Sequence, residues 1–327
     1  MRQLLVTGGA GFIGSHFVRR MLAADDVEHV TVLDALTYAG NLANLADVFD
    51  SPKMTFVHGD IVDAYLVAHL MADHNQVVHF AAESHVDHSF HRAGAFAVTN
   101  IIGTQRLLDA ASKAGIAKFV HVSTDEVYGP LPTGAAAEDA PLRPTVPYAA
   151  SKAASDLVAL SYATTFGLPV CVTRSSNNYG PGQHPEKVIP RFITRLLAGQ
   201  TVSLHGHGQH VRNWLHVEDN CAGIDLVLRE GLPGEVYNLC SGTDLTNREL
   251  TALLLRGCDA DWDRVSYIPD RTANDLRYAM DCTKAAALGY RPEHGLQEGL
   301  AETIAWFRSH PDRCTPPTTP AIAGGTR

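Results

Sequence analysis

The sequence predicts an α/β fold, a Rossmann-type doubly wound parallel sheet with a smaller C-terminal α/β substrate-binding lobe. Short apolar runs rich in β-branched residues alternate with helical patterns over residues 1–175. The first run, residues 4–7, leads directly into Gly8-Gly9-Ala10-Gly11-Phe12-Ile13-Gly14 and then into a helical pattern at residues 15–22. A strand, a glycine turn and a helix in this order are typical of a dinucleotide-binding unit.

The glycine turn and the second strand indicate which dinucleotide is bound. Glycines at this spacing permit a tight turn, close approach of the backbone to a pyrophosphate, and close packing of the helix on the strand. The second strand, residues 30–33, ends at Asp34, whose carboxylate can accept hydrogen bonds from ribose hydroxyls and would repel a 2′-phosphate. No arginine stands beside Asp34, so we expect NAD rather than NADP. In the turn and the helix start, the expected cofactor contacts are Gly8, Gly11, Phe12, Ile13 and Gly14.

The following strands extend the same sheet. Residues 55–58 form the third strand and precede Asp60 and Ile61, which we expect at the edge of the adenine ring. Residues 76–80 form the fourth and precede Ala81 and Ala82, whose small side chains let a flat cofactor lie against the backbone. Two long helices at 100–114 and 148–166 and a strand at 170–174 follow. The alanine-rich faces of these helices fit an interface between subunits, and they fit packing against their own sheet equally well.

The strand at residues 118–123 precedes the candidate catalytic residues. It ends in Thr124-Asp125-Glu126, and open α/β sheets place their ligands at the carboxyl ends of strands. Pro147 signals a helix start, and Tyr148 and Lys152 share one helix face at i, i+4. We expect the Lys152 ammonium to lower the pKa of the Tyr148 phenol and make it a base near neutrality. Such pairs also occur on ordinary helices and adjacent acids in turns, but their combination with the glycine turn favours an enzyme site.

The pattern changes after residue 175. Residues 176–182 predict a turn-rich segment, 186–190 lead into a helix, 235–239 predict a strand, and 245–310 predict helices with short connections, the last ordered one at 301–310. We expect an NAD-binding domain at 1–175 with a returning segment near 211–243, and a substrate-binding lobe at 176–210 and 244–314. Residues 315–327, with three prolines, are expected to be a disordered tail.

Composition and charge exclude several classes of function. The net charge of −9 and the lack of a dense Lys/Arg run argue against nucleic acid and anionic membrane surfaces as partners. No apolar run approaches the length of a membrane-spanning helix, and the N-terminus runs straight into a strand, so neither a membrane span nor a signal peptide is expected. The six cysteines, at 171, 221, 240, 258, 282 and 314, show no CxxC spacing and are expected to be reduced thiols in a cytoplasmic protein.

A group of histidines, His205, His207 and His210, raises the possibility of a metal site. Glycines interrupt the group, and neither a carboxylate nor a thiolate completes a ligand set. We therefore expect no metal.

With these residues assembled, the chain resembles the extended short-chain dehydrogenase/reductase superfamily and, within it, the dTDP-glucose 4,6-dehydratases. The resemblance runs from Thr7 to about His310. It is carried by Gly-Gly-Ala-Gly-Phe-Ile-Gly, Ala-Ala-Glu-Ser-His-Val-Asp, Ser-Thr-Asp-Glu-Val-Tyr-Gly, Tyr-Ala-Ala-Ser-Lys, Ser-Asn-Asn-Tyr-Gly-Pro and Asp-Leu-Arg-Tyr-Ala-Met-Asp. The adjacent Asp and Glu separate dehydratases from the related epimerases, which lack them.

The resemblance implies a three-step reaction. Tyr148 takes the proton of the sugar C4 hydroxyl while hydride passes from C4 to NAD; Thr124 bonds the same hydroxyl, and Lys152 lowers the tyrosine pKa and binds the nicotinamide ribose. The 4-ketone acidifies the C5 proton, which Glu126 removes, and Asp125 protonates the departing C6 hydroxyl. Hydride then returns to C6, giving a 4-keto-6-deoxy sugar. Neighbouring acids with opposite tasks need separated pKa values, which a closed site with like charges side by side can provide.

The resemblance also implies a nucleotide-diphosphate sugar as substrate. The residues implied to hold it are Ser84, His85, Asn177, Lys187, Val188, Ser203, His205, Arg212, Asn247, Arg271 and Asn274. Arg212 and Arg271 suit a pyrophosphate clamp, with surface ion pairing as the alternative.

Four positions depart from the family pattern and leave the nucleotide and sugar open. His205 stands where the family has a base-stacking tyrosine, Ser203 where it has proline, Asn274 where it has histidine, and His88 where it has arginine. A histidine can still stack on a base.

Three alternatives remain. One is a 4,6-dehydratase acting on a UDP-, GDP- or ADP-linked sugar; another is a nucleotide-sugar 4-epimerase or decarboxylase. The third, a non-catalytic NAD-sensing module, is disfavoured because Tyr148 and Lys152 are both present. The family also implies a homodimer.

Overall fold

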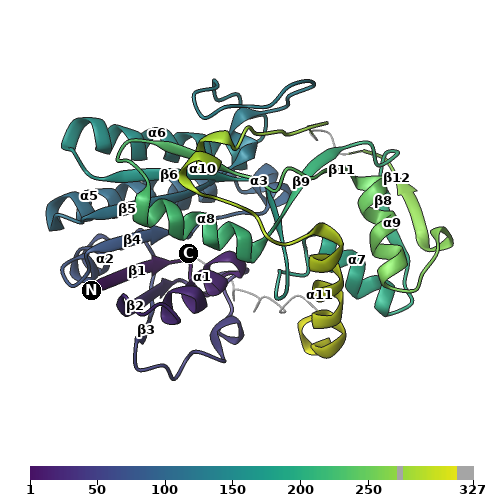
Figure 1. Cartoon of the computed structure of the whole chain (residues 1–327), viewed down its shortest axis with the longest axis horizontal. Helices are drawn as coiled ribbons and strands as arrows, with labels where there is room; N and C mark the ends of the chain where they lie inside the picture. Colours follow the sequence, from purple (N-terminus) through teal and green to yellow (C-terminus); the bar gives the residue numbers. More distant parts are fainter. Residues whose placement is uncertain (271–274, 315–327) are drawn as a thin grey trace, which may run out of the picture.

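A computed structural model describes residues 1–270 and 275–314, and its centre is a seven-stranded parallel sheet (Figure 1). The strand order is β10-β6-β5-β4-β1-β2-β3. The strands are β1 (Arg2–Thr7), β2 (Val27–Asp34), β3 (Met54–His58), β4 (Gln76–His79), β5 (Lys118–Thr124), β6 (Val170–Ser175) and β10 (Val236–Leu239). The chain moves outward from β1 in one direction and from β4 in the other, so the order reverses between these two strands. A crevice at such a reversal is where doubly wound sheets bind their ligands.

Helices cover both faces of the sheet, as the predicted fold class requires. On one face, α1 (Phe12–Leu22), α8 (Val217–Glu230) and α10 (Thr283–Leu288) contribute buried residues to a core with the strands. On the other face, α2 (Ala64–Met71), α5 (Thr104–Ala114) and α6 (Pro147–Phe166) form a second core. The strands are apolar on both sides, because each face is covered. The doubly wound α/β fold is therefore confirmed.

The strands expected in the first 175 residues are all present. Their observed ends lie close to the predicted ones, with β2 starting three residues earlier, at Val27. The helix expected at 100–114 is more complex, because α5 is preceded by α3 (Val86–His91), α4 (Ala93–Phe96) and the π-helix η2 (Ala97–Gly103). Short 3-10 helices occur at η1 (Leu42–Leu45) and η3 (Asp125–Tyr128).

A smaller lobe lies beside the carboxyl ends of the sheet strands (Figure 1). It contains a three-stranded sheet, β11-β9-β7, and a two-stranded sheet, β12-β8. Its elements are β7 (Asn177–Tyr179), α7 (Val188–Leu197), β8 (Val202–His205), β9 (Val211–His216), β11 (Asp244–Thr246), α9 (Asn247–Gly257), η4 (Trp262–Arg264), β12 (Val265–Ile268), α11 (Leu296–Ser309) and η5 (Pro311–Cys314). Apolar residues from α7, α9 and α11 share a core of their own with Trp214 of β9.

The lobe corrects several sequence-based expectations. Residues 176–182 are not only turns, since they include β7, and residues 245–310 include the strand β12 as well as helices. The last long helix, α11, begins at Leu296 rather than at residue 301. Strands of three or four residues carry too little periodicity to be recognised without their partners. The expected tail at 315–327 lies outside the described residues.

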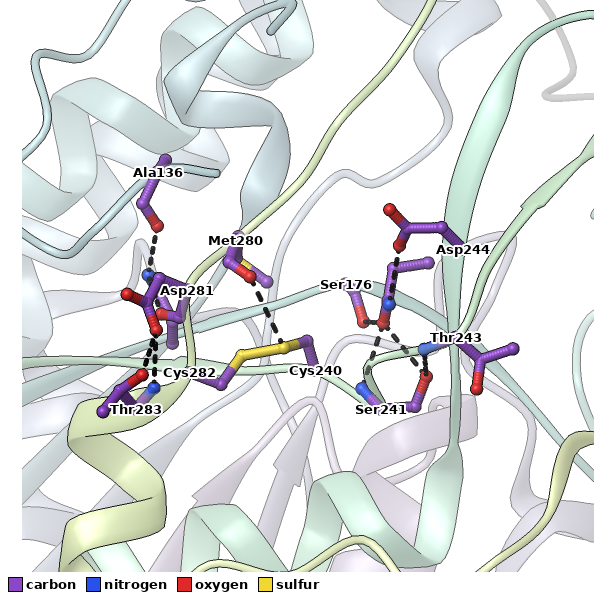
Figure 2. The surroundings of a disulfide bond; sticks show 12 residues. Ala136, Ser176, Cys240, Ser241, Thr243, Asp244, Met280, Asp281, Cys282 and Thr283 are labelled. Atoms are coloured by element: carbon purple, nitrogen blue, oxygen red, sulfur yellow. Dashed lines mark hydrogen bonds between the residues drawn. A yellow bond between two sulfur atoms is a disulfide. The ribbon is translucent and has the colours of Figure 1, made fainter. Parts of the chain in front are cut away.

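The expectation of six reduced cysteines is wrong for one pair. Cys240 and Cys282 form a disulfide with a Cα–Cα distance of 6.2 Å (Figure 2). Cys240 follows β10, and Cys282 ends a segment whose Met280 forms a β-bridge with Ala136. The pair is 42 residues apart in sequence, so tertiary structure alone brings the two sulfur atoms together. The remaining four, at positions 171, 221, 258 and 314, are free thiols.

The helices of the described segments include none that combines the length and the apolar character needed to cross a membrane.

Candidate active site

One cavity runs along the carboxyl ends of the central strands and into the lobe. The residues expected to bind the cofactor or to carry the chemistry all line it: Gly8, Gly11, Phe12, Ile13, Gly14, Asp34, Asp60, Ile61, Ala81, Ala82, Thr124, Asp125, Glu126, Tyr148 and Lys152. They come from five strand ends and from the starts of α1 and α6, segments far apart in sequence. The structure therefore brings together one continuous set of predicted site residues.

The glycine turn leaves no room for side chains. Gly8 has a φ of +72°, and a Cβ atom there would lie 2.6 Å from the backbone nitrogen of Ala81. A Cβ atom on Gly14 would lie 2.2 Å from the carbonyl oxygen of Gly8. Gly11 is the N-cap of α1, so the first amides of that helix face the cavity side of the turn. This narrow turn at a helix N-terminus fits the pyrophosphate of a dinucleotide.

Asp34 ties the loop that follows β2 to the glycine turn. Its two carboxylate oxygens accept hydrogen bonds from the backbone amides of Ala10 (2.9 Å) and Leu36 (2.8 Å). Burial raises the pKa of this carboxyl, and the two amide bonds oppose that rise. A carboxylate has about four acceptor positions, so the two amide bonds leave capacity for ribose hydroxyls. The site therefore fits an NAD molecule.

The candidate catalytic acids lie directly after β5. Thr124 caps the short helix η3: its side-chain oxygen accepts a hydrogen bond from the amide of Glu126 and donates one of 3.2 Å to Asp125. Asp125 is 3% exposed. Burial, followed by the negative charge of Glu126, raises the pKa of Asp125 to about 7, while Arg212 opposes the rise. Two adjacent carboxyl groups are therefore held in unlike environments, which favours a proton on Asp125.

Tyr148 differs from its sequence-based expectation. Burial and then the charges of Glu126 and Asp125 raise its pKa well above the ordinary value, and a hydrogen bond to Thr124 opposes them. Lys152 is not among the largest influences on this phenol, and its ammonium donates a hydrogen bond of 2.8 Å to the carbonyl oxygen of Val122. The expectation that the Tyr148 phenol becomes a base near neutrality is therefore wrong for the protein alone, because the net shift of its pKa is upward. Nearby carboxylates, which the sequence could not place, dominate the phenol's environment.

An asparagine that the sequence did not single out connects two sides of the site. Asn100 lies in the π-helix η2 and is 1% exposed. Its side chain accepts a bond from the amide of Glu83 (2.8 Å) and donates to the carbonyl oxygen of Glu83 (3.0 Å) and to Ser151 Oγ (2.8 Å). Ser151 lies between Tyr148 and Lys152 on α6. A polar residue within an apolar helical run was the only sequence signal, and π-helices are frequent at functional sites.

The residues expected to hold the substrate divide into groups. Of those in the described part of the chain, Ser84, Asn177 and Lys187 line the cavity. Lys187 Nζ donates a bond of 3.2 Å to the carbonyl oxygen of Ser84, which joins the lobe to the end of β4. The expected residues that do not line the cavity are His85, Val188, Ser203, His205, Arg212 and Asn247. Arg271 and Asn274 lie outside the described residues.

Arg212 and His205 belong to two strands of the lobe. Arg212, on β9, places its guanidinium 4.5 Å from the centre of the Tyr278 ring, and its charge acts on Asp125. His205 ends β8, and its Nδ1 lies 3.2 Å from the carbonyl oxygen of Pro269. Asn247, the first residue of α9, donates its amide to the carbonyl oxygen of His210. None of these three residues lines the cavity itself, although the charge of Arg212 reaches Asp125.

The three histidines considered as a metal site do not form one of the metal-competent groups found among the described residues. Those groups are His85, His88 and Glu186, and His216, His294 and Glu302. Both contain a histidine whose ring is stacked on another histidine.

Comparison with known proteins identifies the family. The family model described as GDP-mannose 4,6 dehydratase matches residues 5–303. A dTDP-glucose 4,6-dehydratase of Streptomyces antibioticus is 56% identical over 313 residues, which cover 94% of this chain and 92% of the relative. The crystal structure of DesIV, a dTDP-glucose 4,6-dehydratase from Streptomyces venezuelae with NAD bound, aligns with a TM-score of 0.93 at 54% identity, covering 95% of this chain and 98% of that one.

A structure of another activity lies farther away. The UDP-glucose 4-epimerase of Thermotoga maritima aligns with a TM-score of 0.87 at 33% identity, covering 94% of this chain and 99% of that one. The scaffold is thus shared with epimerases, whereas the higher identities are with dehydratases. The chain belongs to the dTDP-glucose 4,6-dehydratase family of the extended short-chain dehydrogenase/reductase superfamily.

Proposed function

We propose that this protein is an NAD-dependent hydro-lyase that converts dTDP-glucose to dTDP-4-keto-6-deoxyglucose. The observation that carries this proposal is the Asp125-Glu126 pair, held after β5 beside Thr124 and close enough to Tyr148 to act on its ionisation. An epimerase needs no acid that protonates a leaving hydroxyl, whereas elimination of water needs both an acid and a base. When bound, NAD supplies a hydride acceptor for sugar C4 and a hydride donor for C6.

Tyr148 is proposed as the base for the C4 hydroxyl, with Thr124 as its hydrogen-bond partner. Because burial and two carboxylates raise the pKa of Tyr148, the phenolate requires positive charge nearby. Lys152, one helical turn away on α6, is the protein's cation at this position and would also bind the nicotinamide ribose. Val122, through its carbonyl oxygen, fixes where that ammonium lies.

Asp125 and Glu126 are proposed to divide the elimination between them. The pKa of about 7 lets Asp125 carry a proton at neutral pH, so it can donate that proton to the departing C6 hydroxyl. Glu126 would remove the C5 proton, which a ketone at C4 makes acidic. The unlike environments of the two carboxyl groups support this division of roles.

Substrate binding is proposed to use both expected parts of the chain, residues 1–175 with a returning segment near 211–243, and residues 176–210 with 244–314. Two elements lie on the other side of this division, because β9 pairs within a lobe sheet and α10 packs against the main sheet. Ser84, Asn177 and Lys187 would hold the sugar diphosphate where the two parts meet. Arg212 and Arg271 would bind the pyrophosphate, and His205 the base. Val188, Ser203, His85, Asn247 and Asn274 complete the proposed set.

A homodimer through α6 and its neighbour η2 is proposed as the assembly. Four large apolar side chains on these elements are exposed: Val98 (50%), Ile102 (46%), Leu157 (60%) and Phe166 (61%). An oligomer interface would remove this apolar surface from water. Analytical ultracentrifugation of the protein and of a Leu157→Glu variant tests this, and a monomeric parent protein would contradict it.

A cytoplasmic location is also proposed, because NAD and nucleotide sugars are available there. The Cys240–Cys282 disulfide argues the other way, since reducing compartments keep thiols free. Alkylation of thiols at the moment of cell lysis, followed by mass spectrometry, shows whether this cysteine pair is oxidised or reduced in the cell.

The activity is tested by incubating the protein with dTDP-, UDP-, GDP- and ADP-linked sugars in D₂O and analysing the products by mass spectrometry. We expect loss of water from dTDP-glucose and one deuterium at C5. Product from another nucleotide sugar alone would keep the mechanism and change the substrate. Epimerised sugar without loss of water would contradict the assignment.

A further inference from the structure

A buried carboxylate lies directly beneath the candidate catalytic residues. Tyr148, Lys152 and Asp156 follow one another at intervals of four residues on α6, so they lie along one face of the helix. Lys152 is 4% exposed and Asp156 is 0% exposed. None of the steps proposed above uses Asp156, yet burying an aspartate this deeply is costly unless it is paired.

Asp156 is paired with residues of two central strands. Its Oδ2 accepts a hydrogen bond of 2.9 Å from Arg174 Nε on β6, and its Oδ1 lies 3.3 Å from His121 Nε2 on β5. Arg174 is 2% exposed and also donates to the Tyr128 hydroxyl at 2.8 Å. The carboxylate thus lies at the junction of α6, β5 and β6. There it faces Arg174, which is permanently charged, and His121, which becomes a cation only when protonated.

The buried positive charges in this region outnumber the buried negative ones. Burial, followed by the charge of Lys152, lowers the pKa of His121 to about 4, so this imidazole is neutral at physiological pH. Burial also lowers the pKa of His79, on β4, well below its usual value. The charged groups are then the cations Lys152 and Arg174 against the anion Asp156. Arginine does not give up its proton in proteins. If the buried anion does not balance both cations, it is therefore Lys152 that loses its proton.

We propose that Asp156 is a positioning residue that keeps Lys152 protonated by balancing the two buried cations, Lys152 and Arg174, beneath the active site. The Lys152 ammonium faces Val122 and the cavity on its other side. Burial lowers the pKa of Lys152 to about 8, and the charge of Asp156 opposes this change. Asp156 therefore acts on the reaction through Lys152, without contact to the substrate. The link to turnover rests on the proposed function.

The other titratable groups around Lys152 and Asp156 leave this pairing in place. On the elements packed against α6, they are Asp87, His88 and His91 of α3, Arg106, Asp109 and Lys113 of α5, Lys118 of β5, Cys171 of β6, and Asp125, Glu126 and Tyr128 of η3. Asp109 bonds to Tyr162 and Gln105, farther along α6 and α5. Glu126 and Asp125 act on Tyr148, at the cavity end of the helix.

The proposal predicts opposite effects from the two ends of one ion pair. Asp156→Asn removes the anion, so we expect the titration midpoint of Lys152 to fall by about one pH unit or more. Arg174→Gln removes the competing cation and leaves Asp156 to Lys152 alone, so the midpoint should rise. A purely structural role for the Asp156–Arg174 pair would give both variants the same effect. Ser155→Ala is the matched control, because it removes a neutral hydroxyl 3.1 Å from the same His121 nitrogen.

The midpoint is measured by NMR titration of lysine-labelled holoenzyme, in which Lys152 is one of six lysines and is assigned with Lys152→Arg. Equal or same-direction shifts in Asp156→Asn and Arg174→Gln would overturn the proposal. If Asp156→Asn does not fold, the test rests on Arg174→Gln alone. An upward shift of the Lys152 midpoint in that variant would support the proposal, and no upward shift would overturn it.

A kinetic measurement separates this inference from the proposed function. In an Asp125→Asn background, which slows the elimination, the absorbance of reduced nicotinamide reports the oxidation of dTDP-glucose at C4. The pH at which this step declines should follow the NMR midpoint in each variant. A midpoint that moves as expected without a matching change in the rate would support the role of Asp156 and contradict the role given to Lys152 in the reaction.

Discussion

The Lys152 ammonium donates a hydrogen bond of 2.8 Å to the backbone carbonyl oxygen of Val122, in the strand that ends at the candidate catalytic residues. This bond fixes the ammonium at the base of the cavity, one helical turn from Tyr148. The Tyr148 phenol, in contrast, is affected first by burial and then by Glu126 and Asp125. The ionisation of Tyr148 and Lys152 therefore depends on a larger set of charges around them. This dependence is the basis of the following predictions.

Tyr148→Phe should abolish turnover with dTDP-glucose and retain NAD. The substitution removes the hydroxyl that is proposed to accept the C4 proton but keeps the ring, and loss of a general base typically lowers rates by about 10²–10⁴-fold. Steady-state kinetics and the nicotinamide content of the purified protein measure the two effects. A variant with near-normal kcat would rule out Tyr148 as the base.

Glu126→Gln should permit oxidation at C4 but prevent exchange of the C5 proton with solvent. Glutamine keeps the shape of the side chain but cannot accept the proton. Mass spectrometry of substrate recovered from D₂O gives the result. The matched variant is Asp125→Asn, which keeps the base. With this variant, the substrate should exchange its C5 proton with solvent but lose water slowly. Normal deuterium incorporation in Glu126→Gln would remove the role assigned to Glu126.

Asp125→Asn should stabilise the protein more at pH 8 than at pH 5. The pKa of Asp125 rises from 3.8 to about 7 on folding, so the folded protein binds this proton more tightly than the unfolded chain does. The free energy of unfolding therefore falls as pH rises through that window, by on the order of 4 kcal/mol in total, and asparagine does not titrate. Urea unfolding at both pH values measures the difference. Equal effects at pH 5 and pH 8 would show that the carboxyl is already ionised below that window.

The same pKa predicts how activity depends on pH. If elimination requires protonated Asp125, the rate of water loss should be highest below about pH 7 and should fall as the pH rises through that value. The rate of water loss in the Asp125→Asn variant should lack this decline.

Gly14→Ala should destabilise the protein and weaken NAD binding. The added Cβ atom would lie 2.2 Å from the carbonyl oxygen of Gly8, so the turn must open, at a typical cost of about 1–3 kcal/mol. Thermal unfolding and NAD titration measure the two losses. Gly94→Ala is the control, because nothing lies within 4 Å of its added Cβ atom. Similar behaviour of the two variants would mean that the turn adapts.

Much of the NAD-binding half was predictable because its signals are local. The turn after β1, Asp34 at the end of β2 and the alanines after β4 each follow a strand, and parallel strands bring their carboxyl ends to one edge. The β7 and β12 strands were missed because they are too short to show a period, and the Cys240–Cys282 pair because its partners are 42 residues apart.

By itself, the sequence determined the doubly wound sheet, the glycine turn, and the strand and helix that carry the candidate catalytic residues Thr124, Asp125, Glu126, Tyr148 and Lys152. These features depend on strand and helix periods and on spacing along the chain. Only the tertiary structure decided their electrostatics. The pKa of Tyr148 rises rather than falls, Asn100 connects Glu83 to Ser151, and Asp156 meets Arg174. The physical reason is that burial, and charges brought from other strands, set the ionisation of a side chain, and neither can be read from its neighbours in sequence.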